Sequence, residues 1–384
     1  MTMELPAIAR IAAALVAALL ISFIATPVVK SIAQMVGAVD VPKDNRRMHN
    51  HPIPRMGGLA IFLGFLLSTL IFVPMSSSMR GMLLGGVIIV ILGIFDDIYA
   101  LPALPKLLVQ IAAALVAVLH GNVIQVLSNP NIFSENPYWT LGSLAVPLSV
   151  IWIVAITNAV NLIDGLDGLA VGVATISSLT MLVSENVVAL MMAALAGGCI
   201  GFMPYNLNPA KIFMGDTGST FLGFVLATVS IQGLFKFYTI ISFAVPFLML
   251  GLPLFDTCFA ILRRLAKGQS PMAPDRSHVH HRLIDMGFNQ KQAVAILYVI
   301  SAILGLSAVV LTTSGALKAM VLLCALCLAG LISGKIFLSH NENHQEKTKE
   351  KESNDHAIES HDDLRDPPGG GEDGPSGKGT GEQS

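Results

Sequence analysis

Long apolar runs separated by short polar segments occupy the first 340 residues of the chain. A helix needs about 20 apolar residues to cross the hydrocarbon core of a bilayer. Seven runs approach or exceed this length: 11–29, 57–73, 141–157, 187–203, 239–262, 293–312 and 316–338. Four shorter or interrupted runs lie between them: 81–95, 104–119, 168–183 and 220–235. The pattern predicts an all-α, polytopic membrane bundle of about 11 transmembrane helices.

Composition agrees with a membrane protein and divides the chain into two parts. Of the 384 residues, 53% are hydrophobic and only 12% are charged, whereas soluble domains carry about 25% charged residues. Residues 341–384 hold 12 acidic and 5 basic residues (net −7), and residues 1–340 hold 13 acidic and 18 basic residues (net +5). The last segment has too few apolar residues to form a core. We therefore predict a membrane domain over residues 1–340 and a disordered acidic tail over residues 341–384.

The distribution of charge predicts the orientation in the membrane. Of the 18 basic residues before position 341, 14 fall on one predicted side and four on the other: Arg10, Arg80, Lys236 and Lys318. Because cytoplasmic loops are enriched in Lys and Arg, the N-terminus is expected outside and the tail in the cytoplasm. The chain lacks the clustered basic motifs of nucleic-acid-binding proteins, so no nucleic acid partner is expected.

Two adjacent acids, Asp96 and Asp97, end an apolar run ten residues before Lys106. Charges at the end of a membrane span are costly unless they are solvated, paired or bound to a metal. A solvated helix end would explain one acid. A pair of acids followed by a lysine favours a catalytic site.

The segment 158–168, NAVNLIDGLDG, carries the densest polar pattern. Asn158, Asn161, Asp164 and Asp167 recur every three residues, a spacing that places side chains on one face of a helix. Their oxygens suit a nucleoside or a hydrated Mg²⁺. A turn rich in Asn, Asp and Gly is the alternative, but such a turn would not require this regular spacing.

Asp216 lies in FMGDTGS (213–219), just before another apolar run. It can be a metal ligand or the cap of a helix N-terminus, where backbone N–H groups favour anions. Asp256 lies within an apolar run, where an acid is either functional or paired with Arg263 or Arg264.

Two basic segments could bind phosphate. His278, His280, His281 and Arg282 lie close together in a long basic loop. Zinc is disfavoured there because no further matching ligands follow, so a phosphate contact or a merely solvated loop remains. Arg55, in PIPRMGG (52–58), can present a cation to phosphate or to anionic lipid headgroups.

Five motifs in this order resemble those of the polyprenyl-phosphate N-acetylhexosamine-1-phosphate transferases, the multi-pass relatives of phospho-N-acetylmuramoyl-pentapeptide transferase. They are PIPRMGG (52–58), Asp96-Asp97, NAVNLIDGLDGLA (158–170), FMGDTGS (213–219) and HVHHRL (278–283). The loop 270–283 is similar to the N-acetylglucosamine branch, which initiates lipopolysaccharide and teichoic acid synthesis. The resemblance implies transfer of N-acetylglucosamine 1-phosphate from UDP-GlcNAc to undecaprenyl phosphate, with release of UMP, at the cytoplasmic face of a bacterial plasma membrane.

The resemblance also implies roles for individual residues. Asp216, helped by Asn161, would ligate Mg²⁺, with Mn²⁺ as an alternative ion. Asp96 and Asp97 would orient or activate the acceptor phosphate. The sequence leaves open direct attack and a covalent intermediate; we favour direct attack, because adjacent carboxylates near Mg²⁺ suit a general base. The uridine pocket would comprise Asp164, Gly165, Leu166, Asp167, Asn206 and Phe213. Phosphate or sugar contacts would come from Arg55, Lys106, His278, His280, His281 and Arg282.

Two other functions stay open at this point. The same reaction could use another donor, such as UDP-MurNAc-pentapeptide or UDP-GalNAc. A membrane transporter is the alternative of a different class, but transporters place polar sites near the bilayer midplane between internal repeats. Here the acids cluster at one predicted face instead. The sequence leaves open whether the protein forms a homodimer.

Overall fold

The computed structural model describes residues 6–41, 51–128, 138–183, 186–233, 244–266, 268 and 278–314. All of them belong to one of two units, Met1–Leu323. The predicted span 316–338, the tail 341–384 and the basic positions of loops 42–50 and 269–277 lie outside the described residues.

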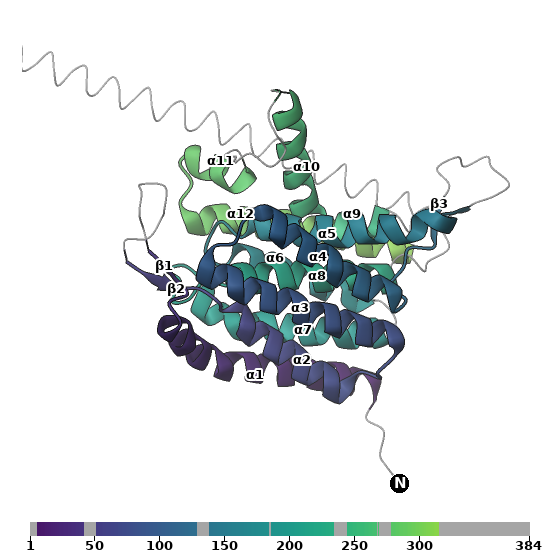
Figure 1. The fold of residues 1–384 in the computed structure, drawn as a ribbon, viewed down its shortest axis with the longest axis horizontal. Coiled ribbons are helices and arrows are strands. Elements are labelled where there is room, and N and C mark those ends of the chain that lie inside the picture. Colours follow the sequence, from purple (N-terminus) through teal and green to yellow (C-terminus); the bar gives the residue numbers. More distant parts are fainter. Residues whose placement is uncertain are drawn as a thin grey trace, which may run out of the picture. The chain divides into compact units, whose positions relative to one another are not determined.

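Helices make up most of the described chain (Figure 1). They are α1 (Ala7–Met35), α2 (Gly58–Phe72), α3 (Ser77–Tyr99), α4 (Ala103–Leu119), α5 (Ala145–Ile163), α6 (Leu169–Thr180), α7 (Asn186–Asn206), α8 (Gly215–Gly233), α9 (Ala244–Met249), α10 (Gly251–Ala266), α11 (Val279–Asp285) and α12 (Gln290–Ser314). Within the described ranges, five helical segments are long and apolar enough to cross a membrane: Ala7–Met35, Ser77–Tyr99, Gly142–Ile163, Val187–Asn206 and Gln290–Leu311. The helical membrane class is confirmed, and the total of about 11 spans stays a prediction.

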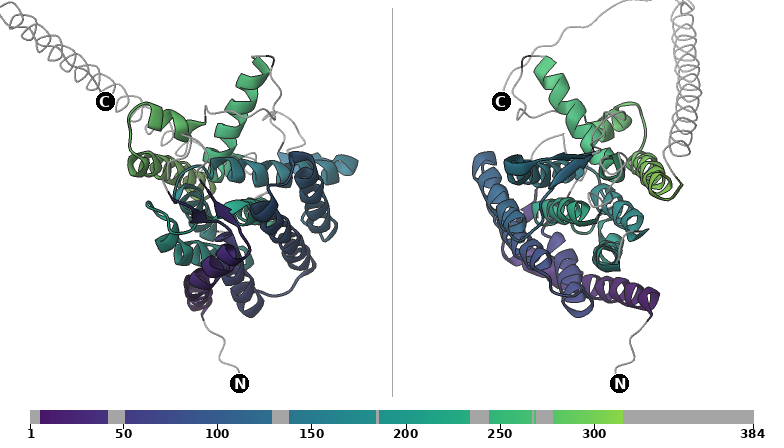
Figure 2. Two further views of the ribbon diagram at one scale, coloured as in Figure 1. Left: turned by 60° about the vertical axis from the view of Figure 1, so that its left-hand side comes forward. Right: turned by 90° about the vertical axis from the view of Figure 1, so that its right-hand side faces the viewer.

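The predicted single run 239–262 is wrong as one continuous helix, because the chain breaks between α9 and α10 at Leu250. Pro253 has no backbone N–H to donate to the carbonyl of Met249. The Ser177 hydroxyl of α6 donates to that carbonyl instead, at 2.8 Å. A hydrogen bond from a neighbouring helix thus satisfies the broken end, and α10 projects from the bundle in both views of Figure 2.

Short strands add a feature that the apolar pattern does not predict. β1 (Val39–Asp40) pairs antiparallel with β2 (Ile53–Pro54), and β3 (Val126–Ser128) pairs with β4 (Tyr138–Thr140). The chain after β2 also pairs with Phe213, which donates its N–H to the carbonyl of Pro54 and accepts one from Gly57. This pairing attaches the PIPRMGG segment to the start of α8.

Helix α8 runs through the middle of the bundle, packed against α2, α3, α5 and α6. Its large side chains, including Phe221, Leu222 and Phe224, are buried. Glycines let its first turn lie very close to the neighbouring backbones. A Cβ on Gly58 would lie 1.9 Å from Gly218 Cα, and a Cβ on Gly93 would lie 2.3 Å from Thr217 Cα. Small residues at these contacts permit the approach.

Consecutive helices run in alternate directions, so the polar motifs meet at one end of the bundle. The C-terminal ends of α3, α5 and α7 lie there with the N-terminal ends of α2, α4 and α8, as their hydrogen bonds establish. Arg10 marks the opposite end, because it donates to the carbonyl of Phe72 at the end of α2.

Candidate active site

A cavity of about 400 Å³ opens where these helix ends meet, a size typical of small-molecule sites. Its wall contains six carboxylates and two basic side chains, Arg55 and His281. The carboxylates belong to Asp40, Asp97, Asp164, Asp167, Asp216 and Asp285. The wall is completed by Asn161, Gly165, Leu166, Asn206, Phe213, Met214, Gly215, Ile284 and Gln290. Most of the predicted site residues therefore surround one space.

Asp97 fastens the end of α3 to the start of α8. Its carboxylate accepts the backbone N–H groups of Asp216 (3.0 Å) and Thr217 (3.1 Å) and the Thr217 hydroxyl (2.6 Å). Arg55 lies beside it and donates to the backbone carbonyls of Asp97 and Asp96. Asp97 is thus a cap for α8, supplied by another helix.

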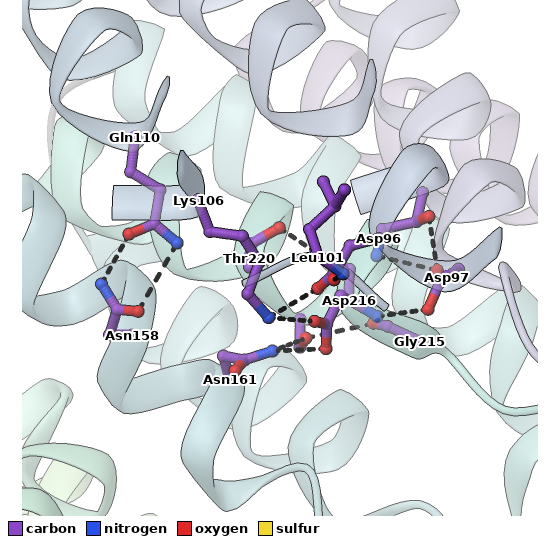
Figure 3. Close-up of polar contacts among 12 residues, drawn as sticks. Asp96, Asp97, Leu101, Lys106, Gln110, Asn158, Asn161, Gly215, Asp216 and Thr220 are labelled. Carbon is purple, nitrogen blue, oxygen red and sulfur yellow. Dashed lines mark hydrogen bonds and ion pairs between the residues drawn. The ribbon is translucent and has the colours of Figure 1, made fainter. Parts of the chain in front are cut away.

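Asp96 points to the other side of α3 and organises the turn into α4 (Figure 3). Its Oδ1 accepts the N–H of Leu101 at 2.7 Å, and its Oδ2 accepts Lys106 Nζ at 2.7 Å. Lys106 Nζ also lies 3.2 Å from Asp216 Oδ2. One ammonium group therefore bridges carboxylates from α3 and α8.

The two asparagines of the NAVN segment have different partners (Figure 3). Asn161 donates to Asp216 Oδ1 (2.9 Å) and to the Ser219 hydroxyl (2.8 Å). Asn158, one turn earlier on α5, pairs with Gln110 of α4 at 2.7 Å. The second pair is mostly buried and lies one turn from Lys106, so it holds α4 against α5.

The loop after α5 supplies the predicted nucleotide-binding residues. Asp167 accepts the Asn208 amide and the N–H of Ala210, whereas Asn206 bonds to the backbone of Gly168 and Ile212. Within the described chain, no residue donates a hydrogen bond to the carboxylate of Asp164. Burial and the negative charges of its neighbours raise the pKa of Asp164 to about 8, as expected for an acid held among other acids.

Only part of the predicted histidine cluster reaches the cavity. His281 lines it. His278 bonds to Asp256 at 3.0 Å, and Asp256 also accepts the N–H of Val279 at the start of α11. His280 is buried behind Gly165, and this burial, with the neighbouring His281, lowers the pKa of His280 to about 4. Arg282 is exposed and lies outside the cavity wall.

Three wall residues with polar side chains were absent from the predicted site: Asp40, Asp285 and Gln290. Asp285 lies four positions after His281 on α11, so helical spacing could have placed the two side chains on one face. Asp40 reaches the wall through the β1–β2 pairing, which the apolar pattern does not reveal. Gln290 begins α12, and no local sequence signal singles it out.

The donor set is suited to Mg²⁺. The wall carries more carboxylates than basic groups, and oxygen ligands are those that Mg²⁺ prefers. In the described ranges, no three His, Cys, Asp or Glu side chains form a ready-made metal site. Mg²⁺ commonly uses only one or two carboxylates together with substrate phosphates. Asp216 and the Asn161 side chain offer such a partial set at the cavity wall.

Comparison with known proteins shows sequence similarity over most of the chain. The family described as "Glycosyl transferase family 4" matches residues 79–234. A "Probable undecaprenyl-phosphate N-acetylglucosaminyl 1-phosphate transferase" of Bacillus subtilis is 44% identical, with 79% of this chain and 86% of the relative covered. A "Decaprenyl-phosphate N-acetylglucosaminephosphotransferase" of Mycobacterium tuberculosis is 35% identical, with 73% of this chain and 77% of the relative covered. An "Undecaprenyl-phosphate alpha-N-acetylglucosaminyl 1-phosphate transferase" of Escherichia coli K12 is 28% identical, with 72% of this chain and 77% of the relative covered.

Proposed function

The chain belongs to glycosyl transferase family 4, and on that premise we propose that it transfers N-acetylglucosamine 1-phosphate from UDP-GlcNAc to undecaprenyl phosphate. An oxygen of the lipid phosphate forms a bond to the phosphorus that carries the sugar. The bond from this phosphorus to the bridging oxygen breaks, and UMP leaves. The products are undecaprenyl-diphosphate-GlcNAc and UMP. The lipid product is the first membrane intermediate in the synthesis of a cell-envelope glycopolymer such as teichoic acid.

One observation carries the proposal: three separate motifs contribute acids to a single cavity at one end of the helices. Asp97 comes from α3, Asp164 and Asp167 from the loop after α5, and Asp216 from α8. Phe213 adds an aromatic face for a base. A soluble nucleotide and a membrane lipid can meet only at such a membrane face.

The chain's own residues position the two phosphates. Lys106, held between Asp96 and Asp216, offers a cation beside the cavity, and Arg55 offers another on its wall. Such preorganised charges stabilise the transition state of phosphoryl transfer. His281, which lines the cavity, contacts the diphosphate or sugar, whereas His278 and His280 shape the loop that carries it. Asp96 orients the acceptor phosphate through Lys106, and attack is direct.

Mg²⁺, held by Asp216 with Asn161, would neutralise charge on the diphosphate when bound. Lys106 already neutralises part of the charge of Asp216 through a bond to its Oδ2. An ion could therefore use the remaining lone pairs of that carboxylate. Mn²⁺, which prefers similar oxygen ligands, is expected to substitute for it.

The cavity end of the bundle is assigned to the cytoplasm of a bacterial plasma membrane, with the N-terminus outside. Fourteen of the 18 basic residues before position 341 belong to the side that carries the site motifs. Arg10, at the other end, is one of the four exceptions.

The test is UMP release by the detergent-purified full chain with undecaprenyl phosphate and Mg²⁺. UDP-GlcNAc, UDP-GalNAc and UDP-MurNAc-pentapeptide are compared as donors. We expect release with UDP-GlcNAc, loss of release with EDTA, and at least 100-fold loss in Asp216→Asn. Asp373→Asn, in the tail, is the matched control and should retain activity. Absence of UMP release with all three donors would overturn the proposal, and release with only another donor would reassign the substrate.

A further inference from the structure

Gln290 lies at the first position of α12, far along the sequence from the acidic motifs, yet its side chain lines the cavity. Its side chain is the last member of a series of hydrogen bonds that begins at Asp167. Asp167 Oδ2 accepts Asn208 Nδ2 at 2.9 Å and the N–H of Ala210 at 3.1 Å. Asn208 Nδ2 also donates to Gln290 Oε1 at 2.7 Å.

The chemistry of these groups determines which atom donates and which accepts in each of these hydrogen bonds. An ionised carboxylate only accepts hydrogen bonds, so the amide nitrogen of Asn208 must face Asp167. Both hydrogens of that nitrogen are then used, one for Asp167 and one for Gln290. Because the oxygen of Gln290 accepts the second hydrogen, its amide nitrogen must point elsewhere with two donors.

Those donors have no protein acceptor within the described part of the chain, and neither does Asp167 Oδ1 receive a donor there. Asp167 and Gln290 both line the cavity and are connected through Asn208, so the pair offers a ligand an acceptor, Asp167 Oδ1, and a donor, Gln290 Nε2. Leu166 and Phe213 add apolar surface to the same wall. A flat ligand with an N–H next to a carbonyl would complement this arrangement.

We propose that Gln290 donates a hydrogen bond to O4 of the uracil base, the carbonyl oxygen that cytosine replaces by an amino group, and that with Asp167 it selects uracil over cytosine. This rests on the proposed function, in which the donor substrate is a uridine nucleotide. Uracil has an imide N–H between two carbonyls. Cytosine has a nitrogen lone pair at the imide position, which would face the carboxylate unfavourably. Asn208 sets the orientation of the Gln290 amide and is a positioning residue.

Nucleotide binding to the detergent-purified full chain in Mg²⁺ buffer tests this assignment. UMP and CMP are titrated calorimetrically into wild type and Gln290→Met, which keeps the length of the side chain but has no N–H donor. The loss of one neutral hydrogen bond should weaken UMP about fivefold and leave CMP unchanged. Gln290→Glu, which replaces the donor by an anion, should weaken UMP further.

Gln292→Met is the matched control. Gln292 is exposed in the same helical turn, where its side chain accepts the N–H of Asn289 and does not line the cavity, so UMP affinity should stay at the wild-type value. Asn208→Ala should weaken UMP and be non-additive with Gln290→Met, because both act through the same amide.

Unchanged UMP affinity in both Gln290 variants, or equal losses for UMP and CMP, would overturn the assignment. A loss seen with UDP-GlcNAc but not with UMP would also overturn it, since Gln290 would then read the sugar. Failure of UMP release from UDP-GlcNAc, with base-selective UMP binding intact, would refute the transferase reaction alone. The two proposals therefore fail in distinguishable ways.

Discussion

Replacing Gly93 by alanine should disable the site without touching any side chain that lines the cavity. The added Cβ would lie 2.3 Å from Thr217 Cα and 2.6 Å from Thr217 N. Ordinary carbon contacts begin near 3.4 Å, so α3 and α8 must move apart by about 1 Å. The neighbour is backbone, which cannot rotate away.

The displacement lengthens the hydrogen bonds that Asp97, one turn later on α3, accepts from Asp216 and Thr217. Those bonds are 2.6–3.1 Å long, and a 1 Å separation takes them past about 3.5 Å, where a hydrogen bond is lost. Asp97 then becomes a buried carboxylate with fewer donors, and Asp216 shifts relative to Lys106. A misplacement of this size can cost about 100-fold in rate.

The assay is UMP release together with thermal unfolding of the detergent-purified protein. We expect Gly93→Ala to lose about 100-fold in activity and to melt at a lower temperature. Gly86→Ala is the matched control on the same helix, because its nearest atom, Phe221 Cε2, lies at an ordinary 3.7 Å. Activity of Gly93→Ala within twofold of Gly86→Ala would refute the close-approach argument.

Two further predictions concern buried polar groups. Gln110→Leu removes the side-chain partner of Asn158 and leaves it only the backbone carbonyl of Val154. This should cost about 1–3 kcal/mol of stability, measured by thermal unfolding. The double variant Gln110→Leu/Asn158→Leu should recover part of this loss, and additive losses would contradict the pairing. His280, with its pKa lowered from 6.5 to about 4, binds fewer protons folded than unfolded between these values. The free energy of unfolding should therefore fall as pH drops from 6.5 to 4, by at most about 3 kcal/mol; His280→Gln should flatten this dependence, and an unchanged acid profile would contradict it.

The apolar pattern by itself determined the helical membrane class and the approximate place of most helices. Each run is long enough for a helix, and a helix satisfies the backbone hydrogen bonds of such a run within the run itself. The pattern also located the site at one end of the bundle. Runs that cross in alternate directions bring the end of α3, with Asp96 and Asp97, next to the start of α8, with Asp216.

Tertiary structure decided what each polar residue does there. Asp96 and Asp97 are adjacent in sequence, but a helix turns about 100° per residue, so one faces Lys106 and the other caps α8. Pro253 could have predicted the break before α10, whereas the Ser177 hydroxyl that satisfies it comes from another helix. Gln290 carries no local motif and reaches the cavity only because α12 packs beside α6. Contacts between residues distant in sequence depend on packing, which no local pattern encodes.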